Sequence, residues 1–151
     1  LVLQTVLPPL MLADAPSRIT LQGGTHNPMA PPFHFLERCF APLLRKLGVG
    51  LDLELRRLGF YPAGGGEFSA TITPVNRAAD GGDGKAGASL APFDIDERGA
   101  LVETFAECLA PGLPQSVATR ELAALAQAMG LSREQLLTPV VRQNEGPACR
   151  A

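Results

Sequence analysis

The segment that most constrains the fold is residues 21–35, which reads LQGGTHNPMAPPFHF. It lies between an alternating apolar run and a run with helical spacing, and it contains two adjacent glycines and three prolines. Glycine adopts positive φ easily and lets the backbone approach a bound group. Proline fixes φ and has no N–H, so the segment is stiff and cannot pair along its length as a strand. The pattern predicts a rigid loop whose polar residues, Thr25, His26 and Asn27, can point at an enclosed group.

Three blocks of the sequence resemble one family. On physical grounds alone, the loop would also fit an ordinary strand-to-helix connection that begins a helix with proline. However, residues 23–36 (GGTHNPMAPPFHFL) resemble the Gly-Gly-Thr-x-Asn-Pro-x-Ala-Pro-Pro signature of the RNA 3'-terminal phosphate cyclases. Residues 1–8 (LVLQTVLP) and 59–66 (GFYPAGGG) resemble the same family in the same order and at similar spacing. The resemblance is specific over residues 1–68 and becomes thin beyond residue 75.

Size and composition indicate one globular domain, or slightly more than one. A compact domain of 151 residues buries roughly 70% of its unfolded surface. A hydrophobic content of 46% is typical of globular proteins. No apolar run approaches the roughly 20 residues of a membrane helix, so we expect no membrane partner. Because the chain starts with Leu1 inside an apolar segment and lacks a basic leader, we expect a fragment of a longer protein rather than a secretory signal.

Cysteine usage and charge restrict the compartment and the mode of RNA binding. Cys39, Cys108 and Cys149 are odd in number and widely separated, which favours a reducing cytoplasm over a disulfide scaffold or a zinc site. A net charge of −2 gives no broad attraction to a phosphate backbone. If RNA is the substrate, we therefore expect it to be held locally, at its end.

Hydrophobic periodicity predicts an α+β fold with a βαββ-type unit, a sheet with a helix on one face, in residues 1–75. A helical stripe covers residues 32–47, with Gly48 as its stop and a bend or early break at Pro42. The residues expected to face the sheet are Leu36, Phe40 and Leu43. Alternating patterns predict three strands, at residues 18–22, 51–55 and 67–75.

An additional helix is predicted at residues 1–12, with a kink at Pro8 and Pro9 because neither proline can donate a helical hydrogen bond. Its expected buried positions are Val2, Val6 and Leu10, with Leu3 and Leu7 beside them. Gln4 is the one long polar side chain in this segment, and it either bonds back to the backbone or contacts a ligand.

The second half of the chain differs in composition. Residues 76–89 are rich in Gly, Ala and Asp without a period, which predicts a flexible linker. Residues 90–151 resemble the beginning of a smaller α/β domain inserted within the cyclases; a continuation of the first sheet is the alternative. The elements expected there are a strand at 100–109, a helix capped by Ser116, with Val117, Leu122, Leu125 and Met129 on one face and Gly130 at its end, a capped turn at 132–135 and a strand at 136–141.

The resemblance implies an enzyme that works through a histidine adenylylated by ATP. The AMP passes to an RNA 3'-phosphate, and the neighbouring 2'-hydroxyl attacks to form a 2',3'-cyclic phosphate. The nucleophilic histidine of the family lies beyond residue 151, and neither His26 nor His34 matches it, so we name no catalytic residue. We expect His26 to bond the loop or solvent and His34 to be a surface or boundary residue.

The resemblance also implies a set of ligands and contacts. Gln4 matches a nucleotide-contacting glutamine, Pro31 matches a proline at the wall of the ATP pocket, and Phe35 is a weaker candidate near the adenine. ATP and a divalent metal, Mg²⁺ or Mn²⁺, are the expected cofactors, although no residue here is nominated as a metal ligand. RNA ends with a 3'-phosphate are the expected partner.

Two other classes of protein remain open. Cyclase-like factors of ribosome assembly share the fold without catalysing cyclisation. Enolpyruvyl transferases are built from similar repeated units, but a shared fold does not give a shared function. They would need clustered Lys and Arg for anionic substrates, and residues 23–32 contain none.

Overall fold

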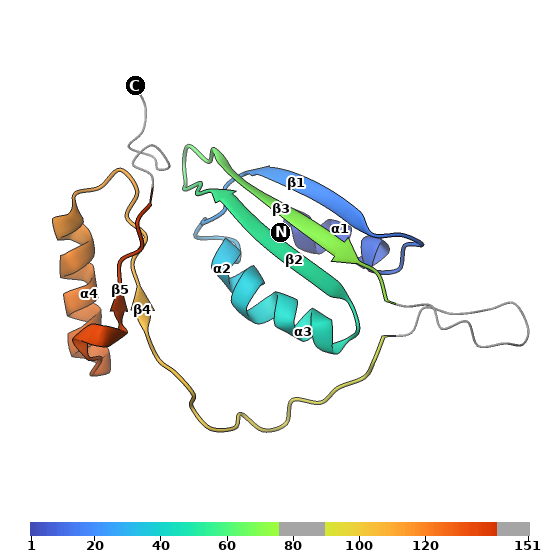
Figure 1. The fold of residues 1–151 in the computed structure, drawn as a ribbon. Helices are drawn as coiled ribbons and strands as arrows, with labels where there is room; N and C mark the ends of the chain where they lie inside the picture. Colours follow the sequence, from blue (N-terminus) through green and yellow to red (C-terminus); the bar gives the residue numbers. More distant parts are fainter. Residues whose placement is uncertain (76–89, 142–151) are drawn as a thin grey trace, which may run out of the picture.

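The computed structural model describes residues 1–75 and 90–141. The predicted linker, residues 76–89, lies outside the described residues. The described chain forms a three-stranded sheet with helices and, after an irregular segment, a smaller helix-and-strand unit (Figure 1). The predicted α+β class is confirmed.

The three predicted strands form one antiparallel sheet in the order β1-β3-β2. Ala70 in the central strand lies between Ile19 and Leu53, so alternating apolar residues of all three strands share one face. That face carries the core residues Leu51 and Ile72, both fully buried. The strands are β1 (Ser17–Gly23), β2 (Gly50–Arg57) and β3 (Gly66–Thr73).

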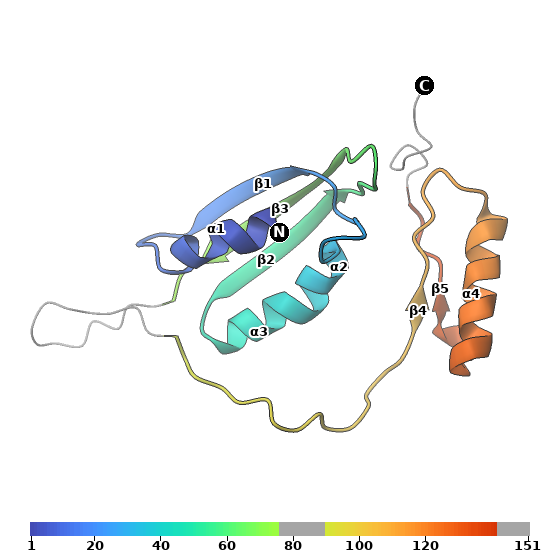
Figure 2. The same ribbon diagram turned by 180° about the vertical axis from the view of Figure 1, so that it is seen from behind.

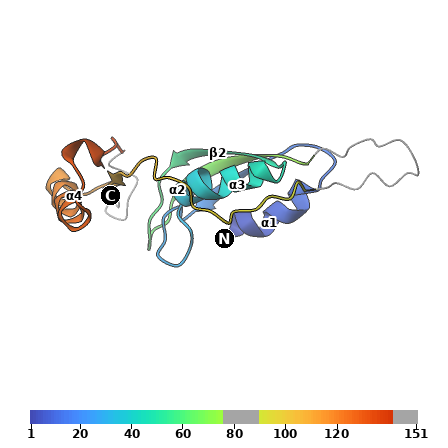
Figure 3. The same ribbon diagram turned by 90° about the horizontal axis from the view of Figure 1, so that it is seen from below.

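All helices of this unit lie on the same face of the sheet (Figures 2 and 3). Their buried side chains and those of the sheet form a single hydrophobic core cluster. Because one layer of helices covers one face of a sheet, the unit is a two-layer structure with one polar face left open. The helical elements are α1 (Val2–Met11), α2 (Phe33–Phe35), the π-helical turn η1 (Leu36–Phe40) and α3 (Ala41–Lys46).

The face predicted for the second helix is confirmed at Leu36, which is buried, and at Phe40, which packs against the core, but it is wrong at Leu43. The N–H of Ala41 donates to the carbonyl of Leu36, five residues earlier, which makes η1 a wider turn than an α-helix. Pro42 follows at once and has no N–H to give to the carbonyl of residue 38, so the wide turn accommodates the proline without breaking the helix. The extra residue rotates the later positions. Ala41 and Leu44 are buried, whereas Leu43 is 38% exposed.

The buried face of α1 also differs from the prediction. Leu3 and Leu7, four residues apart, are the buried residues of this helix, whereas Val2 is 61% exposed and Val6 is only half-buried. The helix continues through both prolines to Met11. Apolar content alone could not decide which stripe of such an apolar helix faces the sheet.

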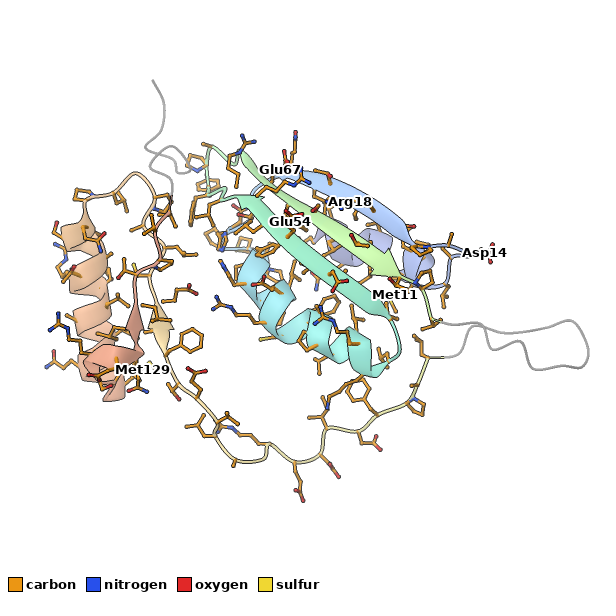
Figure 4. All side chains as sticks on the ribbon, in the orientation of Figure 1. Met11, Asp14, Arg18, Glu54, Glu67 and Met129 are labelled. Atoms are coloured by element: carbon orange, nitrogen blue, oxygen red, sulfur yellow. The ribbon has the colours of Figure 1, made fainter. Side chains whose placement is uncertain are left out.

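Charged and polar residues cover the open face of the sheet (Figure 4). Glu54 pairs with Arg18 at 3.4 Å and accepts a hydrogen bond from the Ser69 hydroxyl at 3.1 Å. Glu67 accepts a hydrogen bond from Gln22 at 2.8 Å. These side chains alternate with the core residues along each strand, as expected for a half-buried sheet.

Residues 100–141 form a small parallel unit, as the strand–helix–strand pattern predicts. β4 and β5 pair in parallel as a separate two-stranded sheet, so the alternative of a continued first sheet is not observed. The strands are far shorter than predicted, and Val102 is 96% exposed. The elements are β4 (Ala106–Glu107), α4 (Gln115–Met129), the 3-10 turn η2 (Arg133–Gln135) and β5 (Leu136–Leu137).

The ends of α4 confirm one predicted cap and correct the other. Gly130 has a φ of 67° and ends the helix in the left-handed conformation that glycine favours. The helix begins after Pro114, so Ser116 lies inside its first turn and is not the cap. The predicted apolar face is also rotated: Ala118 and Leu122 are buried, whereas Leu125 and Met129 are exposed.

The predicted capping box of the next turn is confirmed. Gln135 Oε1 accepts a hydrogen bond from the Ser132 N–H at 2.8 Å.

None of the helices within residues 1–75 and 90–141 combines the length and apolar character needed to cross a bilayer.

Candidate functional site

The loop after β1 is locked to the β2–β3 connection by hydrogen bonds to Gly59. The backbone N–H groups of Thr25 and His26 both donate to the Gly59 carbonyl at 2.9 Å. In return, the Gly59 N–H donates to the Thr25 hydroxyl at 2.9 Å. Thr25 is only 6% exposed, so its hydroxyl needs partners inside the protein. Two sequence blocks that lie 34 residues apart therefore form one rigid structure.

Glycine is required where these two segments cross. A Cβ on Gly59 would lie 2.3 Å from the Gly66 nitrogen and 2.5 Å from the Gly23 oxygen, and a Cβ on Gly66 would lie 2.7 Å from the Gly59 nitrogen. These neighbours are backbone atoms and cannot rotate away. The close approach explains why both segments carry glycine at this crossing.

A cavity of about 320 Å³, here called the glycine-loop cavity, opens beside this crossing. Apolar side chains of α1, β1, β3 and the second helix form its walls, and the loop supplies polar groups. Asn27 lies directly over Gly24, where a Cβ would come 2.0 Å from the amide nitrogen. The lining residues are Leu1, Val2, Leu3, Leu21, Gln22, Gly23, Gly24, Thr25, Asn27, Ala30, Pro31, Phe33, Leu36 and Phe68.

The structure places the sequence-predicted residues differently. Pro31 lies in the wall of the glycine-loop cavity. Gln4 is half-buried on α1, next to Leu3 of the wall, but does not itself line the cavity. Phe35 is 45% exposed and lies outside the lining. The nucleotide contacts of Gln4 and Pro31 stay predictions.

One feature of the loop, a chain of hydrogen bonds through two histidines, has no signal in the sequence. His26 Nδ1 lies 2.8 Å from the Thr25 hydroxyl, and His26 Nε2 lies 3.0 Å from His34 Nδ1. The His26 ring also stacks on Phe60, with centroids 5.2 Å apart. Both ring nitrogens of His26 are thus engaged within the protein, as expected for a residue that bonds the loop.

The environment of His26 favours its neutral form. Burial, and secondarily the neighbouring His34, lowers the pKa of His26 from 6.5 to about 4. A doubly protonated His26 could accept a hydrogen bond from neither Thr25 nor His34. A neutral ring can donate on one side and accept on the other, so neutrality keeps the chain of hydrogen bonds intact.

A pH dependence of folding follows. Because the pKa of His26 is lower in the folded than in the unfolded chain, the unfolded state binds the proton first as pH falls. The stability that the neutral His26 contributes should be fully present above pH 6.5 and should be lost as the pH falls toward about 4. Urea midpoints measured across this range should fall more steeply for the native protein than for His26→Gln, which keeps a donor and an acceptor but does not titrate. Parallel slopes would contradict the assignment.

The cavity lining does not fit a divalent metal. It contains no Asp, Glu, His or Cys side chain. Among the described residues, no three such side chains are grouped closely enough to hold a metal ion. Carboxylate oxygens are the usual protein ligands of Mg²⁺, and the lining of this cavity supplies none.

Comparison with known proteins agrees with the sequence resemblance. A family model described as RNA 3'-terminal phosphate cyclase matches residues 1–143. A protein of that name from Pseudomonas fluorescens is 47% identical over 97% of this chain and 39% of its own length. Proteins of the same name from Koribacter versatilis and Pseudomonas aeruginosa are 41% and 40% identical over 97% of this chain.

The match extends through the glycine-loop cavity and into the second unit. The chain spans about two fifths of the length of these relatives, 38–39%. The chain belongs to the RNA 3'-terminal phosphate cyclase family.

Proposed function

We propose that this chain forms part of an enzyme that converts an RNA 3'-phosphate to a 2',3'-cyclic phosphate at the expense of ATP. The family match over residues 1–143 supports this proposal most strongly. Because the relatives are more than twice as long as this chain, the activity is proposed for the whole protein. RNA ends with a 3'-phosphate are the proposed partner, and the cytoplasm is the proposed location.

The glycine-loop cavity is the proposed contribution of this chain to the nucleotide site. Its volume of about 320 Å³ is at the small end for ligand cavities, which suits a site that holds part of ATP. Phe33 and Phe68 supply apolar wall against which a base can pack, while Thr25 and Asn27 supply polar groups. The rigid crossing at Gly59 would hold these groups in place, and preorganised sites bind at a lower entropic cost.

In the proposed reaction a histidine attacks the α-phosphorus of ATP and pyrophosphate leaves. The AMP passes from the histidine to the RNA 3'-phosphate, and attack by the 2'-hydroxyl releases AMP and closes the ring. Neither His26 nor His34 is proposed as this nucleophile. A nucleophile needs an accessible ring nitrogen, whereas both nitrogens of His26 are bonded within the protein. His34 is left out because its position does not match that of the histidine nucleophile of the family. The 151-residue chain alone is therefore proposed to be inactive.

A binding factor of ribosome assembly is the alternative. The relatives described above all carry the name of the cyclase, which supports the enzyme over this alternative. One experiment distinguishes the enzyme from the binding factor. The whole protein is incubated with ATP and a short RNA that has a 3'-phosphate, and the RNA end is then analysed by mass spectrometry. The enzyme yields an ATP-dependent loss of one water from the RNA. An unchanged RNA end would favour the binding factor.

Gln4→Ala should weaken ATP use by the whole protein without unfolding it. Loss of one hydrogen bond removes only about 1 kcal/mol of folding stability, whereas a lost nucleotide contact raises the KM for ATP. Thr5→Ala is the matched control, because the Thr5 hydroxyl donates only to the Leu1 carbonyl within the same helix. Equal KM values for ATP in Gln4→Ala and the native protein would remove Gln4 from the site.

A further inference from the structure

A second cavity, here called the Arg57 cavity, lies where the sheet unit meets the small parallel unit. Its volume is about 290 Å³. The sheet unit contributes His34, Arg56 and Arg57, and the parallel unit contributes Glu107 together with apolar wall from residues 139–141. This cavity combines charged and apolar walls from separate parts of the chain.

The lining of the Arg57 cavity carries two arginines, Arg56 and Arg57, and one carboxylate, Glu107. Glu107 is neutralised by Arg38 at 2.8 Å. Arg56 lies 3.5 Å from Glu67 and 4.0 Å from Glu54, on the edge of the open polar face. Arg57 pairs with no carboxylate within the described parts of the chain.

The guanidinium of Arg57 is held by its Nε group, which donates to the Gly65 carbonyl. A guanidinium anchored through Nε can still present its terminal N–H groups, and guanidinium groups bind phosphate in a forked geometry. Gly65 belongs to the glycine-rich connection between β2 and β3. The β2–β3 connection therefore holds the charged guanidinium of Arg57 in place beside the cavity.

His34 offers a second donor to the cavity, its Nε2–H, and the hydrogen bond between His34 Nδ1 and His26 orients the ring. The Thr25 hydroxyl accepts the Gly59 N–H and has one proton to donate, either to His26 Nδ1 at 2.8 Å or to the Gly59 carbonyl at 3.3 Å. When it donates to His26 Nδ1, the shorter contact, His26 Nε2 donates to His34 Nδ1 at 3.0 Å. The His26 ring then accepts through Nδ1 and donates through Nε2, as a neutral imidazole can. In this tautomer His34 must carry its proton on Nε2, the nitrogen that does not face His26.

We propose that the Arg57 cavity is a binding site for a phosphate group, held by the guanidinium of Arg57 and by the Nε2–H of His34. His26 and Thr25 are positioning residues, because they fix the His34 tautomer without touching the ligand. The site is separate from the glycine-loop cavity and takes part in no step of the proposed cyclase reaction. An RNA phosphodiester and a free phosphate share the chemistry that this site recognises.

Binding is tested without ATP, so its failure and a failure of the proposed cyclase activity are distinguishable. The protein, labelled with ¹⁵N-histidine, is titrated with inorganic phosphate in one arm and with a five-nucleotide RNA lacking terminal phosphates in the other. We expect a saturable change at the His34 Nε2 signal in at least one arm. Saturation by RNA alone identifies a phosphodiester, and saturation by both identifies a general phosphate site.

Arg57→Gln should weaken this binding about tenfold, the effect of one charge-assisted hydrogen bond. Arg57 is exposed, so its substitution should leave the fold intact. Arg18→Gln is the matched control, because Arg18 is an exposed arginine of the same sheet that pairs with Glu54 instead of lining the cavity. The control should bind within twofold of the native protein. Equal losses in both variants, or no saturable change in either arm, would overturn the proposal.

The positioning role of His26 is tested by the tautomer of His34. His26→Leu removes both hydrogen bonds of the ring, so the His34 signals should report a mixture of tautomers and binding should weaken. His26→Gln retains a donor and an acceptor, so it should restore the single tautomer and most of the affinity. An unchanged His34 tautomer in His26→Leu would remove His26 from this role.

Discussion

Phe33→Ala should lower the free energy of unfolding by about 3–5 kcal/mol, the usual effect of removing a buried aromatic ring. Phe33 is 2% exposed, and its ring centroid lies 5.4 Å from that of Phe68. It begins the helical segment and belongs to the core cluster that joins this segment to α1 and the sheet. Because the ring also walls the glycine-loop cavity, its loss should enlarge that cavity. Urea unfolding followed by circular dichroism measures the change.

Phe35→Ala is the matched control in the same helical turn. Phe35 is 45% exposed, so its removal should change the free energy of unfolding by less than about 1 kcal/mol. Equal destabilisation by the two substitutions would contradict the placement of Phe33 in the core.

Gly59→Ala should destabilise the fold by about 3 kcal/mol, at the upper end for overpacked sites. The new Cβ would lie 2.3 Å from the Gly66 nitrogen and 2.5 Å from the Gly23 oxygen. These are backbone atoms of strand ends, so relief requires the crossing itself to open. Opening would also lengthen the hydrogen bonds from Thr25 and His26 to the Gly59 carbonyl. Urea unfolding reports the stability, and amide exchange of Thr25 and His26 reports the local opening.

Gly65→Ala separates crowding from backbone conformation. Gly65 has a φ of 74° with open space where a Cβ would lie, so alanine there meets only the left-handed penalty of about 1 kcal/mol. If Gly65→Ala were as harmful as Gly59→Ala, or exposed the Thr25 amide equally, close packing at the crossing would not explain the role of Gly59.

The sheet was predictable because alternation is a property of the strand itself. The patterns at residues 18–22 and 51–55 place every second side chain on one face, and tertiary contacts did not override them. Helix faces were harder to predict. A single π-helical turn ahead of Pro42 rotated the following residues, so Leu43 became exposed and Leu44 buried. A hydrophobic period of 3.6 residues does not predict such a turn.

The candidate site was predictable only in part. Pro31 was identified through the family signature, and the structure places it in the wall of the glycine-loop cavity. The contact between His26 and His34 was not predictable, since these residues are eight positions apart across a loop that has no period. Likewise, the approach of Arg57 to the parallel unit depends on tertiary packing that no local pattern encodes.

The most direct test of the proposed function asks whether the whole protein forms a histidine–AMP bond. The protein is incubated with α-labelled ATP, digested, and the labelled peptide is identified by mass spectrometry. We predict an AMP adduct on a histidine other than His26 and His34, which is discharged when RNA with a 3'-phosphate is added. An adduct on His26 or His34 would contradict our exclusion of both residues as the nucleophile. The absence of any adduct would contradict the proposed enzyme and favour the binding factor.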